Sequence, residues 1–274
     1  MSRVEIVPAT QVSQEQIREG VLAGFSDYAV PMQPSEEAFA FMMRQRGLVP
    51  DASWVAIAEG RVVAVWLVSV AGQAAYLISS GTAPAFRGRG LARGMAARCI
   101  EGLQARGCAT FQTEVLAGNA VAAGLYEKLG MRVVRRLDCY TVPQDGVADV
   151  ELVAWAEVVR DAPGCRDWRP SWQNADAALT RAADDAVCVA VWDDLGLAGY
   201  AAGFAPSGAV AQIAVRPDRR RQGLGRRLVR AITASGVCRV LNVDAADVGF
   251  AGFMAACGAK LSVQQEERML LLQE

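Results

Sequence analysis

Apolar residues near the start of the chain recur every fourth position, as they do in an amphipathic helix. Ile17, Val21 and Phe25 share one helical face. Ser13 and Gln16 precede that face with the spacing of a capping box, which predicts the helix start. Further helices are expected to begin near Ser35, Leu91 and Ala120.

Short runs of apolar and β-branched residues between turns predict the strands. In the first half of the chain these runs lie at residues 54–58, 62–70, 75–80, 111–115 and 133–142. From residue 187 onward, the same order of strands, helix and strand recurs, and residues 150–159 also have the pattern of a strand. The mixture of helices and strands indicates two α/β halves.

The strongest internal repeat lies in two segments rich in arginine and glycine, at residues 82–92 and 215–225. Their Pro, Arg, Gly and Leu positions all match at one constant offset, which pairs Pro84 with Pro217 and Gly90 with Gly223. Weaker similarities before and after these segments keep the same order, which indicates duplication rather than chance. We therefore expect an α/β (α+β) fold with two tandem domains, 1–143 and 147–274, joined in a turn-rich stretch at 141–146.

Charge and composition exclude several functional classes. The 274 residues include 28 Lys and Arg against 29 Asp and Glu, for a net charge of -1, so a generally basic nucleic-acid-binding surface is not expected. The chain has 0 histidines, which excludes Ser–His–Asp chemistry, histidine general bases and histidine metal ligands.

Cysteine usage and hydropathy indicate the compartment. The 7 cysteines have no CxxC spacing and are interpreted as small buried hydrophobic residues rather than as disulfides or zinc ligands. No apolar run reaches membrane-spanning length, and the N-terminus has no long apolar region. We expect a reduced, cytoplasmic protein with no metal and with no membrane or nucleic-acid partner.

The two arginine–glycine segments have the plan of an anion site, because each joins a strand to a helix through a turn containing proline. Glycine lets backbone N–H groups approach phosphate oxygens, and the helix N-terminus adds partial positive charge. Arginine adds cationic contacts that suit a pyrophosphate. The residues expected to bind it are Arg87, Gly88, Arg89, Gly90, Leu91 and Ala92, and in the second segment Val215, Arg220, Arg221, Gln222, Gly223, Leu224 and Gly225.

A dinucleotide is one ligand of this kind. Residues 88–94 can be scanned as a dinucleotide fingerprint, with Glu114 as the acid that binds the ribose. That fingerprint normally follows its strand directly and opens its domain, whereas here residues 81–87 intervene after several strands. The second segment also has Arg221 where the first has Gly88. An NADP-binding oxidoreductase is therefore the weaker interpretation.

The segments resemble the GNAT superfamily of acetyl-CoA-dependent N-acetyltransferases. Its motif (Gln/Arg)-x-x-Gly-x-(Gly/Ala) is matched by residues 87–92 and 220–225. Its second motif, an asparagine followed by a helix ending Leu-Tyr-Glu-Lys-Leu-Gly, is matched by Asn119 and residues 125–130. The resemblance covers most of 1–143 and implies acetyl-CoA as acyl donor, with a mixed, mostly antiparallel, splayed sheet flanked by helices in each domain.

The resemblance also implies roles for residues of the first domain. The thioester would lie between the strands at 77–82 and 111–115. Tyr126 matches the tyrosine that protonates the leaving thiolate, and Asn119 would cap that helix and contact the cofactor arm. The residues expected to hold the pantetheine arm through their backbone are Thr82, Ala83 and Pro84.

The acceptor side is less specified. An ammonium must lose a proton before it attacks, and without histidine the base must be a carboxylate, a tyrosine or a chain of waters. Glu114 is the candidate base, since it lies on a strand that lines the gap. Tyr28 and Tyr76 are candidate substrate-binding residues, with a core or sheet-edge role open for Tyr76. A small-molecule or peptide amine fits, and so does either a monomer or a homodimer.

The second half departs from the family pattern. When Gly258 is aligned with Gly130, Met254 stands for Tyr126 and Asp247 for Asn119. Because methionine cannot donate a proton, we expect the first domain to transfer acetyl from acetyl-CoA to a primary amine by direct attack on the thioester, and the second to be degenerate. Two alternatives stay open: a non-catalytic CoA-binding or regulatory tandem module, and catalysis in the second domain.

Overall fold

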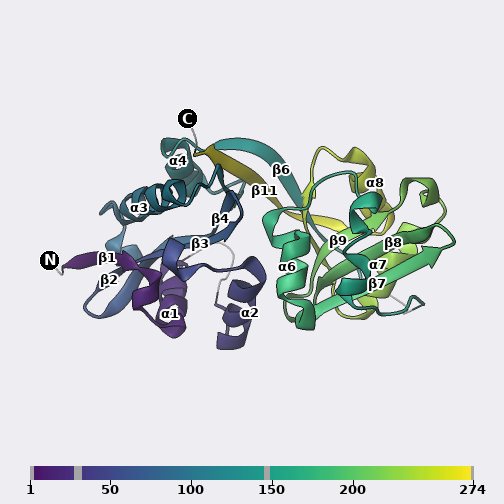
Figure 1. The fold of residues 1–274 in the computed structure, drawn as a ribbon, viewed down its shortest axis with the longest axis horizontal. Coiled ribbons are helices and arrows are strands. Elements are labelled where there is room, and N and C mark those ends of the chain that lie inside the picture. Colours follow the sequence, from purple (N-terminus) through teal and green to yellow (C-terminus); the bar gives the residue numbers. More distant parts are fainter. Residues whose placement is uncertain (1–2, 28–32, 145–148, 273–274) are drawn as a thin grey trace. The chain divides into compact units, whose positions relative to one another are not determined.

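The computed structural model describes residues 3–27, 33–144 and 149–272. Two compact units make up the chain, shown in Figure 1. The first unit comprises Met1–Val134 and Glu267–Glu274, and the second comprises Arg135–Glu266. Each contains a mixed, mostly antiparallel sheet with helices, so the predicted fold class is confirmed.

In the first unit the strands follow the order β1-β2-β3-β4-β5-β11. β1 to β4 pair antiparallel with their neighbours, and β4 and β5 are parallel. The elements are β1 (Val4–Pro8), α1 (Gln14–Gly24), α2 (Glu36–Arg46), β2 (Trp54–Ala58), β3 (Arg61–Ala71), β4 (Ala74–Thr82), α3 (Leu91–Ala105), β5 (Thr110–Leu116), α4 (Ala120–Lys128) and the end of β11 (Lys260–Leu271).

The second unit repeats this plan with the strand order β11-β6-β10-β9-β8-β7. β9 is antiparallel to β8 and parallel to β10, as β4 is to β3 and β5. The elements are β6 (Arg132–Thr141), α5 (Trp155–Val158), α6 (Asp176–Arg181), β7 (Ala186–Asp193), β8 (Gly196–Phe204), β9 (Ala209–Val215), α7 (Leu224–Ala234), β10 (Arg239–Asp244), α8 (Val248–Ala256) and the start of β11.

The compact units differ from the expected domains 1–143 and 147–274 at two strands. Residues 135–141 of β6 belong to the second unit, where they pair with β10, and residues 267–271 of β11 belong to the first, next to β5. The physical reason is that strand hydrogen bonds join segments far apart in sequence. An apolar pattern indicates that a strand forms, but it does not name the neighbour.

Local signals explain the helices of the first unit. Ser13 and Gln16 form the predicted capping box at α1, and Ile17 and Val21 are buried. Residues 150–159, in contrast, are not a strand: the helix α5 occupies the second half of this stretch. Apolar residues in a run this short fit a buried helical turn as well as a strand.

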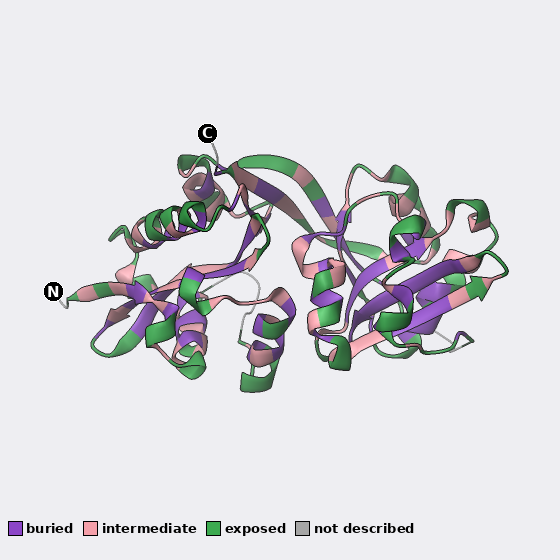
Figure 2. Cartoon of the chain, in the orientation of Figure 1, coloured by how far each residue is buried: buried purple, intermediate pink, exposed green. Residues whose placement is uncertain are grey.

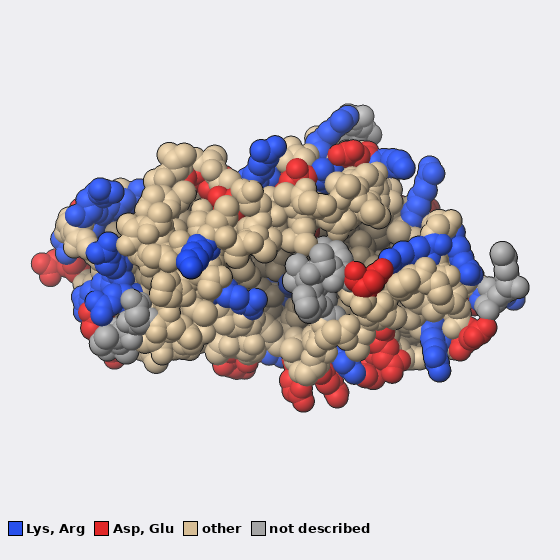
Figure 3. Space-filling model, turned by 180° about the vertical axis from the view of Figure 1, so that it is seen from behind, with Lys and Arg blue, Asp and Glu red and all other residues tan. Residues whose placement is uncertain are grey.

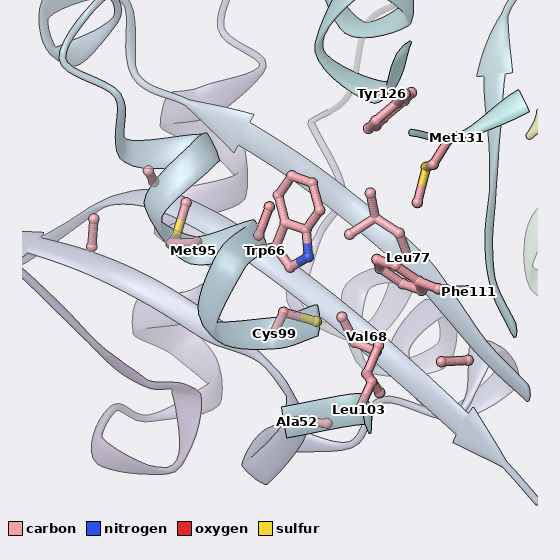
Figure 4. Packing of buried hydrophobic residues seen from close by; sticks show 14 of the residues in the cluster. Ala52, Trp66, Val68, Leu77, Met95, Cys99, Leu103, Phe111, Tyr126 and Met131 are labelled. Carbon is pink, nitrogen blue, oxygen red and sulfur yellow. The ribbon is translucent and has the colours of Figure 1, made fainter. Parts of the chain in front are cut away.

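Buried residues concentrate on the central strands of each sheet (Figure 2). In the first unit, Met95, Cys99 and Leu103 of α3 lie at the predicted four-residue intervals in one buried cluster. Met95 and Cys99 lie beside Trp66 on β3, and Leu103 lies beside Val68 of the same strand (Figure 4). The second unit has its own cluster, in which α7 contributes Leu228 and Ile232. Each unit therefore has a core of its own.

The remaining surface and composition features are as follows. Five of the seven cysteines are buried, and burial raises the pKa of the Cys99 thiol to about 12. On the face seen in Figure 3, basic side chains stand next to acidic ones. Among the described residues, no helix is long and apolar enough to span a membrane.

Candidate active site

A gap opens in each sheet where two parallel strands separate. β4 and β5 pair only at Ala74↔Thr110, Ala75↔Phe111 and Tyr76↔Gln112, although β4 continues to Thr82 and β5 to Leu116. In the second unit, β9 and β10 pair only at Ala209↔Arg239 and Val210↔Val240. Each unit therefore has the expected splayed strands beside its arginine–glycine loop.

A bulge precedes the gap at the same place in both units. On β4, Ile78 is left out of the pairing between Leu77↔Val68 and Ser79↔Leu67. On β9, Ala211 is left out in the same way, at the position that corresponds to Ile78 in the internal repeat. A bulge bends its strand and changes which side chains face each surface. The two units thus share this detail as well as their loops.

The two loops have the same backbone conformation. Gly88 and Gly90 have φ of 74° and 76°, and Arg221 and Gly223, at the matching positions, have 59° and 85°. The left-handed region costs a residue other than glycine roughly 1–2 kcal/mol, so Arg221 is strained where Gly88 is not. Gly90 and Gly223 are the N-cap residues of α3 and α7, and they have no side chain that could accept from the first N–H groups of these helices. The first N–H groups of α3 and α7 thus face the loop, as an anion site requires.

An arginine clamps each loop to its own unit. Arg87 donates Nε to Thr82 O at 2.9 Å and its two Nη atoms to the Asp27 carboxylate at 2.7 and 2.6 Å. Arg220 does the same, with Val215 O at 2.8 Å and Asp167 at 2.9 Å. Both guanidinium groups therefore fix the loop, and their direct contact with a ligand stays a prediction. Arg89 instead stacks over Phe86 and donates to Ala85 O.

Tyr126 lies on α4 beside the gap of the first unit. Asn119 caps this helix as predicted, accepting from Ala122 N at 3.1 Å. The Tyr126 hydroxyl is 3.1 Å from Ser80 Oγ on β4, and its ring meets Trp66 edge-on with 6.5 Å between centroids (Figure 4). The residue is only 5% exposed, so its hydroxyl is held in one place.

Glu114 lies on the opposite face of the same sheet. Tyr76 donates its hydroxyl to Glu114 Oε2 at 3.1 Å. The β4 residues Tyr76 and Ser80 pair with Ser69 and Trp66 of β3. Because these two β3 residues are three positions apart, the side chains of Tyr76 and Ser80 point to opposite faces of the sheet. The structure thus joins two residues that the sequence singled out separately, and it places a carboxylate and a phenol on either side of one gap.

The remaining candidate residues are placed as follows. Thr82, Ala83 and Pro84 follow the splayed end of β4 and lead into the loop, with Ala83 N bonded to Val63 O. Tyr28 lies outside the described residues, so its place in the acceptor wall stays a prediction. Tyr76 is 2% exposed and is bonded to Glu114, and its contact with a substrate likewise stays a prediction.

The second unit has the same gap between its parallel strands, but it lacks the serine and tyrosine hydroxyls of the first unit. Ile213 occupies the position of Ser80 and Met254 that of Tyr126, and both belong to one apolar cluster. A cavity of about 780 Å³ opens between the loop, β9 and α8. The predicted residues that line it are Val215, Arg220, Arg221, Gly223 and Gly225; Gln222 turns to Asp218 O, and Leu224 packs on the core.

A polar network surrounds Gln212 of β9 in the second unit. Gln212, next to the bulge, donates to Asn174 O and Asp176 and accepts from Tyr200 and Arg166. These four bonds, between 2.6 and 3.2 Å, use the full capacity of an amide side chain. Gln212 and Arg166 of this network also line the cavity, and its phenol and carboxylate, Tyr200 and Asp176, are each bonded to Gln212.

Three aromatic residues line this cavity. Trp168 donates Nε1 to Asp247 at 3.2 Å and meets Phe250 edge-on, and Phe250 meets Phe253 in the same way. The spacing of Phe250 and Phe253 on a helix that caps at Asp247 was a usable signal. Trp168 reaches the cavity from a loop that is distant in sequence from α8, so its neighbours depend on the fold.

Comparisons with known proteins identify the family of the chain. The model of the acetyltransferase (GNAT) family matches residues 18–131 and 152–258, so the chain belongs to this family and contains two GNAT regions. It is a GNAT acetyltransferase, in agreement with the resemblance of its two motifs.

Individual relatives match shorter stretches. An acetyltransferase of Pectobacterium atrosepticum is 33% identical over 102 residues, which is 37% of this chain and 70% of that protein. The [ribosomal protein bS18]-alanine N-acetyltransferase of Escherichia coli K12 is 31% identical over 120 residues, 44% of this chain and 78% of that enzyme.

Solved structures match the whole tandem fold. A tandem GNAT protein from the clavulanic acid biosynthesis pathway superimposes with a TM-score of 0.70 and 16% identity, covering 99% of both chains. A GCN5-related N-acetyltransferase from Sphaerobacter thermophilus gives 0.71 and 17%, covering 99% of this chain and 96% of the other. At these identities the likeness concerns the fold.

Proposed function

We propose that the first unit transfers the acetyl group of acetyl-CoA to a primary amine by direct attack on the thioester. The observation that carries this proposal is the pairing of a buried phenol and a carboxylate on opposite faces of one strand gap. The matching positions of the second unit have neither group, although that unit has the same loop, bulge and gap.

The residues around the gap fit a CoA thioester on three grounds. The loop offers open space at Gly88 and Gly90, where an added Cβ would meet nothing within 4 Å. The first N–H groups of α3 point into that loop without a side-chain cap. β4 continues past its last pair with β5 and has backbone groups available to an extended arm. Residues 82–84 and 87–92 would hold the arm and the pyrophosphate.

The chemistry requires two proton transfers by the chain. Bound acetyl-CoA would supply an electrophilic carbonyl and a thiolate leaving group. Glu114 takes a proton from the acceptor ammonium at Oε, and the bond from Tyr76 holds that carboxylate in position. Tyr126 gives its Oη proton to the departing sulfur. Because the two groups lie on opposite faces, the acceptor and the leaving thiol are served from different sides.

The acceptor is proposed only as a class. A carboxylate beside the gap suits a cationic amine, which can be part of a small molecule or a peptide. The similarity to an enzyme named for alanine acetylation on a ribosomal protein supports a peptide amine, over the part of the chain that it matches.

A second proposal concerns the second unit: its strand gap binds CoA or a CoA thioester without transferring the acyl group. The cavity of about 780 Å³ beside the loop supports this. Met254, which stands at the position of Tyr126 and is buried in an apolar cluster, cannot donate a proton to a leaving thiolate. Titration of CoA into the full chain should therefore give two sites, of which one is catalytic.

The test of the transfer proposal is thiol release from acetyl-CoA with amine acceptors, followed with a thiol-reactive dye. Tyr126→Phe and Glu114→Gln keep the shape of the side chains, and each is expected to lower kcat by about 100-fold or more. Met254→Leu, at the position matching Tyr126, is the control and should change kcat less than twofold. Unchanged turnover in Tyr126→Phe would overturn the assignment of the acid.

A further inference from the structure

We propose that Ser80 is a positioning residue for Tyr126, and that the two hydroxyls act as one unit in protonating the leaving thiolate. This inference rests on the proposed function of the first unit. It is carried by the 3.1 Å distance between Ser80 Oγ and Tyr126 Oη, and by the joint replacement of both residues in the second unit.

The bulge on β4 is what brings Ser80 to this position. If Ile78 were paired with β3, the register would shift by one residue. Ser79 would then stand opposite Trp66, and Ser80 would point to the other side of the sheet. With it, Ser80 stands opposite Trp66, whose ring also contacts Tyr126. The bulge thus sets the position of the Ser80 hydroxyl, and the Trp66 ring contacts the tyrosine to which that hydroxyl is bonded.

The direction of the hydrogen bond follows from the chemistry. A phenol has one proton, and a Tyr126 that donates it to Ser80 cannot donate it to sulfur. In the reacting state Ser80 must therefore be the donor. As the C–S bond breaks and its electron pair goes to sulfur, the Tyr126 proton moves to that sulfur. Ser80 keeps its own proton and donates to the phenolate, which later regains a proton from water.

The second unit is a natural comparison, because its backbone is the same while the pair is absent. Ala211 is bulged as Ile78 is, and Ile213 then faces Ala201, the counterpart of Trp66. Met254 is fully buried in the same apolar cluster as Ile213. A hydroxyl at position 213 would have no phenol to serve. Loss of the acid and loss of its partner therefore go together.

The test combines single and double substitutions in the full chain. Ser80→Ala is expected to lower kcat about tenfold or more, since hydrogen bonds to charged groups are stronger than neutral ones. KM for acetyl-CoA should change less than twofold. Ser80→Thr, which keeps the hydroxyl, should stay within about threefold of the original kcat, and Ser79→Ala is the control for loss of a hydroxyl on the other face.

Two further readouts separate positioning from a merely structural role. In Ser80→Ala the alkaline limb of the kcat profile should move to higher pH, because the phenolate has lost its donor. In the Tyr126→Phe background, Ser80→Ala should cause no further loss of kcat. Additive losses, or an unshifted limb, would overturn the inference. A large effect of Tyr126→Phe with none of Ser80→Ala would overturn this inference alone, whereas no effect of Tyr126→Phe would overturn the proposed function.

Discussion

The two units share a backbone plan and differ in the polar residues placed on it. Both have the bulge, the separated strands, the left-handed loop and an arginine clamp with equivalent partners. Beside the first gap, a phenol is bonded to a serine and a carboxylate to a tyrosine, whereas Ile213 and Met254 stand at the positions of that serine and phenol in the second unit. The comparison teaches that the GNAT loop marks a place for a ligand, whereas the chemistry depends on a few side chains on the neighbouring strands and helix.

The largest expected effect concerns the end of β11, which belongs to the first unit although it lies at the end of the sequence. Leu272 is buried in the first unit, and its backbone N–H donates to Ala109 O, while Leu271 is 68% exposed. Leu272→Asp buries an unpaired carboxylate and should lower the free energy of unfolding by about 3–5 kcal/mol. Leu271→Asp, one residue earlier, should lower it by less than about 0.5 kcal/mol. Denaturant unfolding, followed in parallel by circular dichroism and by acetyl-transfer activity, measures both.

That pair of variants addresses the boundary directly. If the domains were the continuous segments 1–143 and 147–274, Leu272→Asp would leave acetyl transfer by the first segment intact. A variant that unfolds in its second half but keeps full transfer activity would therefore contradict the units described.

A smaller effect is expected at the loop clamps. The hydrogen bonds from Arg87 lower the pKa of Asp27, against a smaller opposing effect of desolvation. A lowered carboxyl pKa gives stabilisation that is present above the ordinary value and is lost as pH falls through the lowered one. Acetyl-CoA affinity of the first unit should therefore not vary between pH 8 and 5 on account of this clamp, and should fall only at more acidic pH.

Substituting the carboxylates that bind the two clamp arginines, Asp27 and Asp167, compares acetyl-CoA binding in the two units. Asp27→Asn should weaken acetyl-CoA binding about two- to fivefold at neutral pH and raise KM without a comparable change in kcat, because the pair is exposed. Asp167→Asn should weaken only the site in the second unit. Isothermal titration and steady-state kinetics measure the two effects. A loss of kcat in Asp27→Asn would mean that Arg87 acts on the reacting atoms.

Much of this organisation could be predicted from the sequence, since it depends on local chemistry. Ser13 and Gln16 specify the start of α1, the constant offset between the two arginine–glycine segments gives both loops, and Asn119 caps α4 as expected. The partners of the outer strands could not be predicted, because β6 and β11 carry the same apolar pattern whichever neighbour they pair with.

The candidate site was only partly predictable for a related reason. Tyr126 was proposed from its motif and Glu114 from its strand, but their hydrogen-bond partners Ser80 and Tyr76 depend on the face that each β4 residue occupies. That face changes at the bulge, and a single unpaired residue leaves no reliable mark in the sequence. Trp168 is a similar case, because only the folded chain brings it to α8.

The central claim, that transfer occurs in the first unit, is tested most directly by placing a negative charge in each loop. Gly88 and Arg221 occupy matching left-handed positions, so Gly88→Asp and Arg221→Asp can each be compared with the neutral Asn variant, which tolerates this conformation. Acetyl-CoA binding and turnover are then measured on the same preparations. The account predicts that Gly88→Asp lowers kcat/KM for acetyl-CoA about tenfold or more relative to Gly88→Asn, equivalent to about 1.4 kcal/mol per tenfold. Arg221→Asp should instead weaken acetyl-CoA binding at the second site, and its turnover should equal that of Arg221→Asn. Loss of turnover in Arg221→Asp, with Gly88→Asp unaffected, would place the chemistry in the second unit and contradict the account.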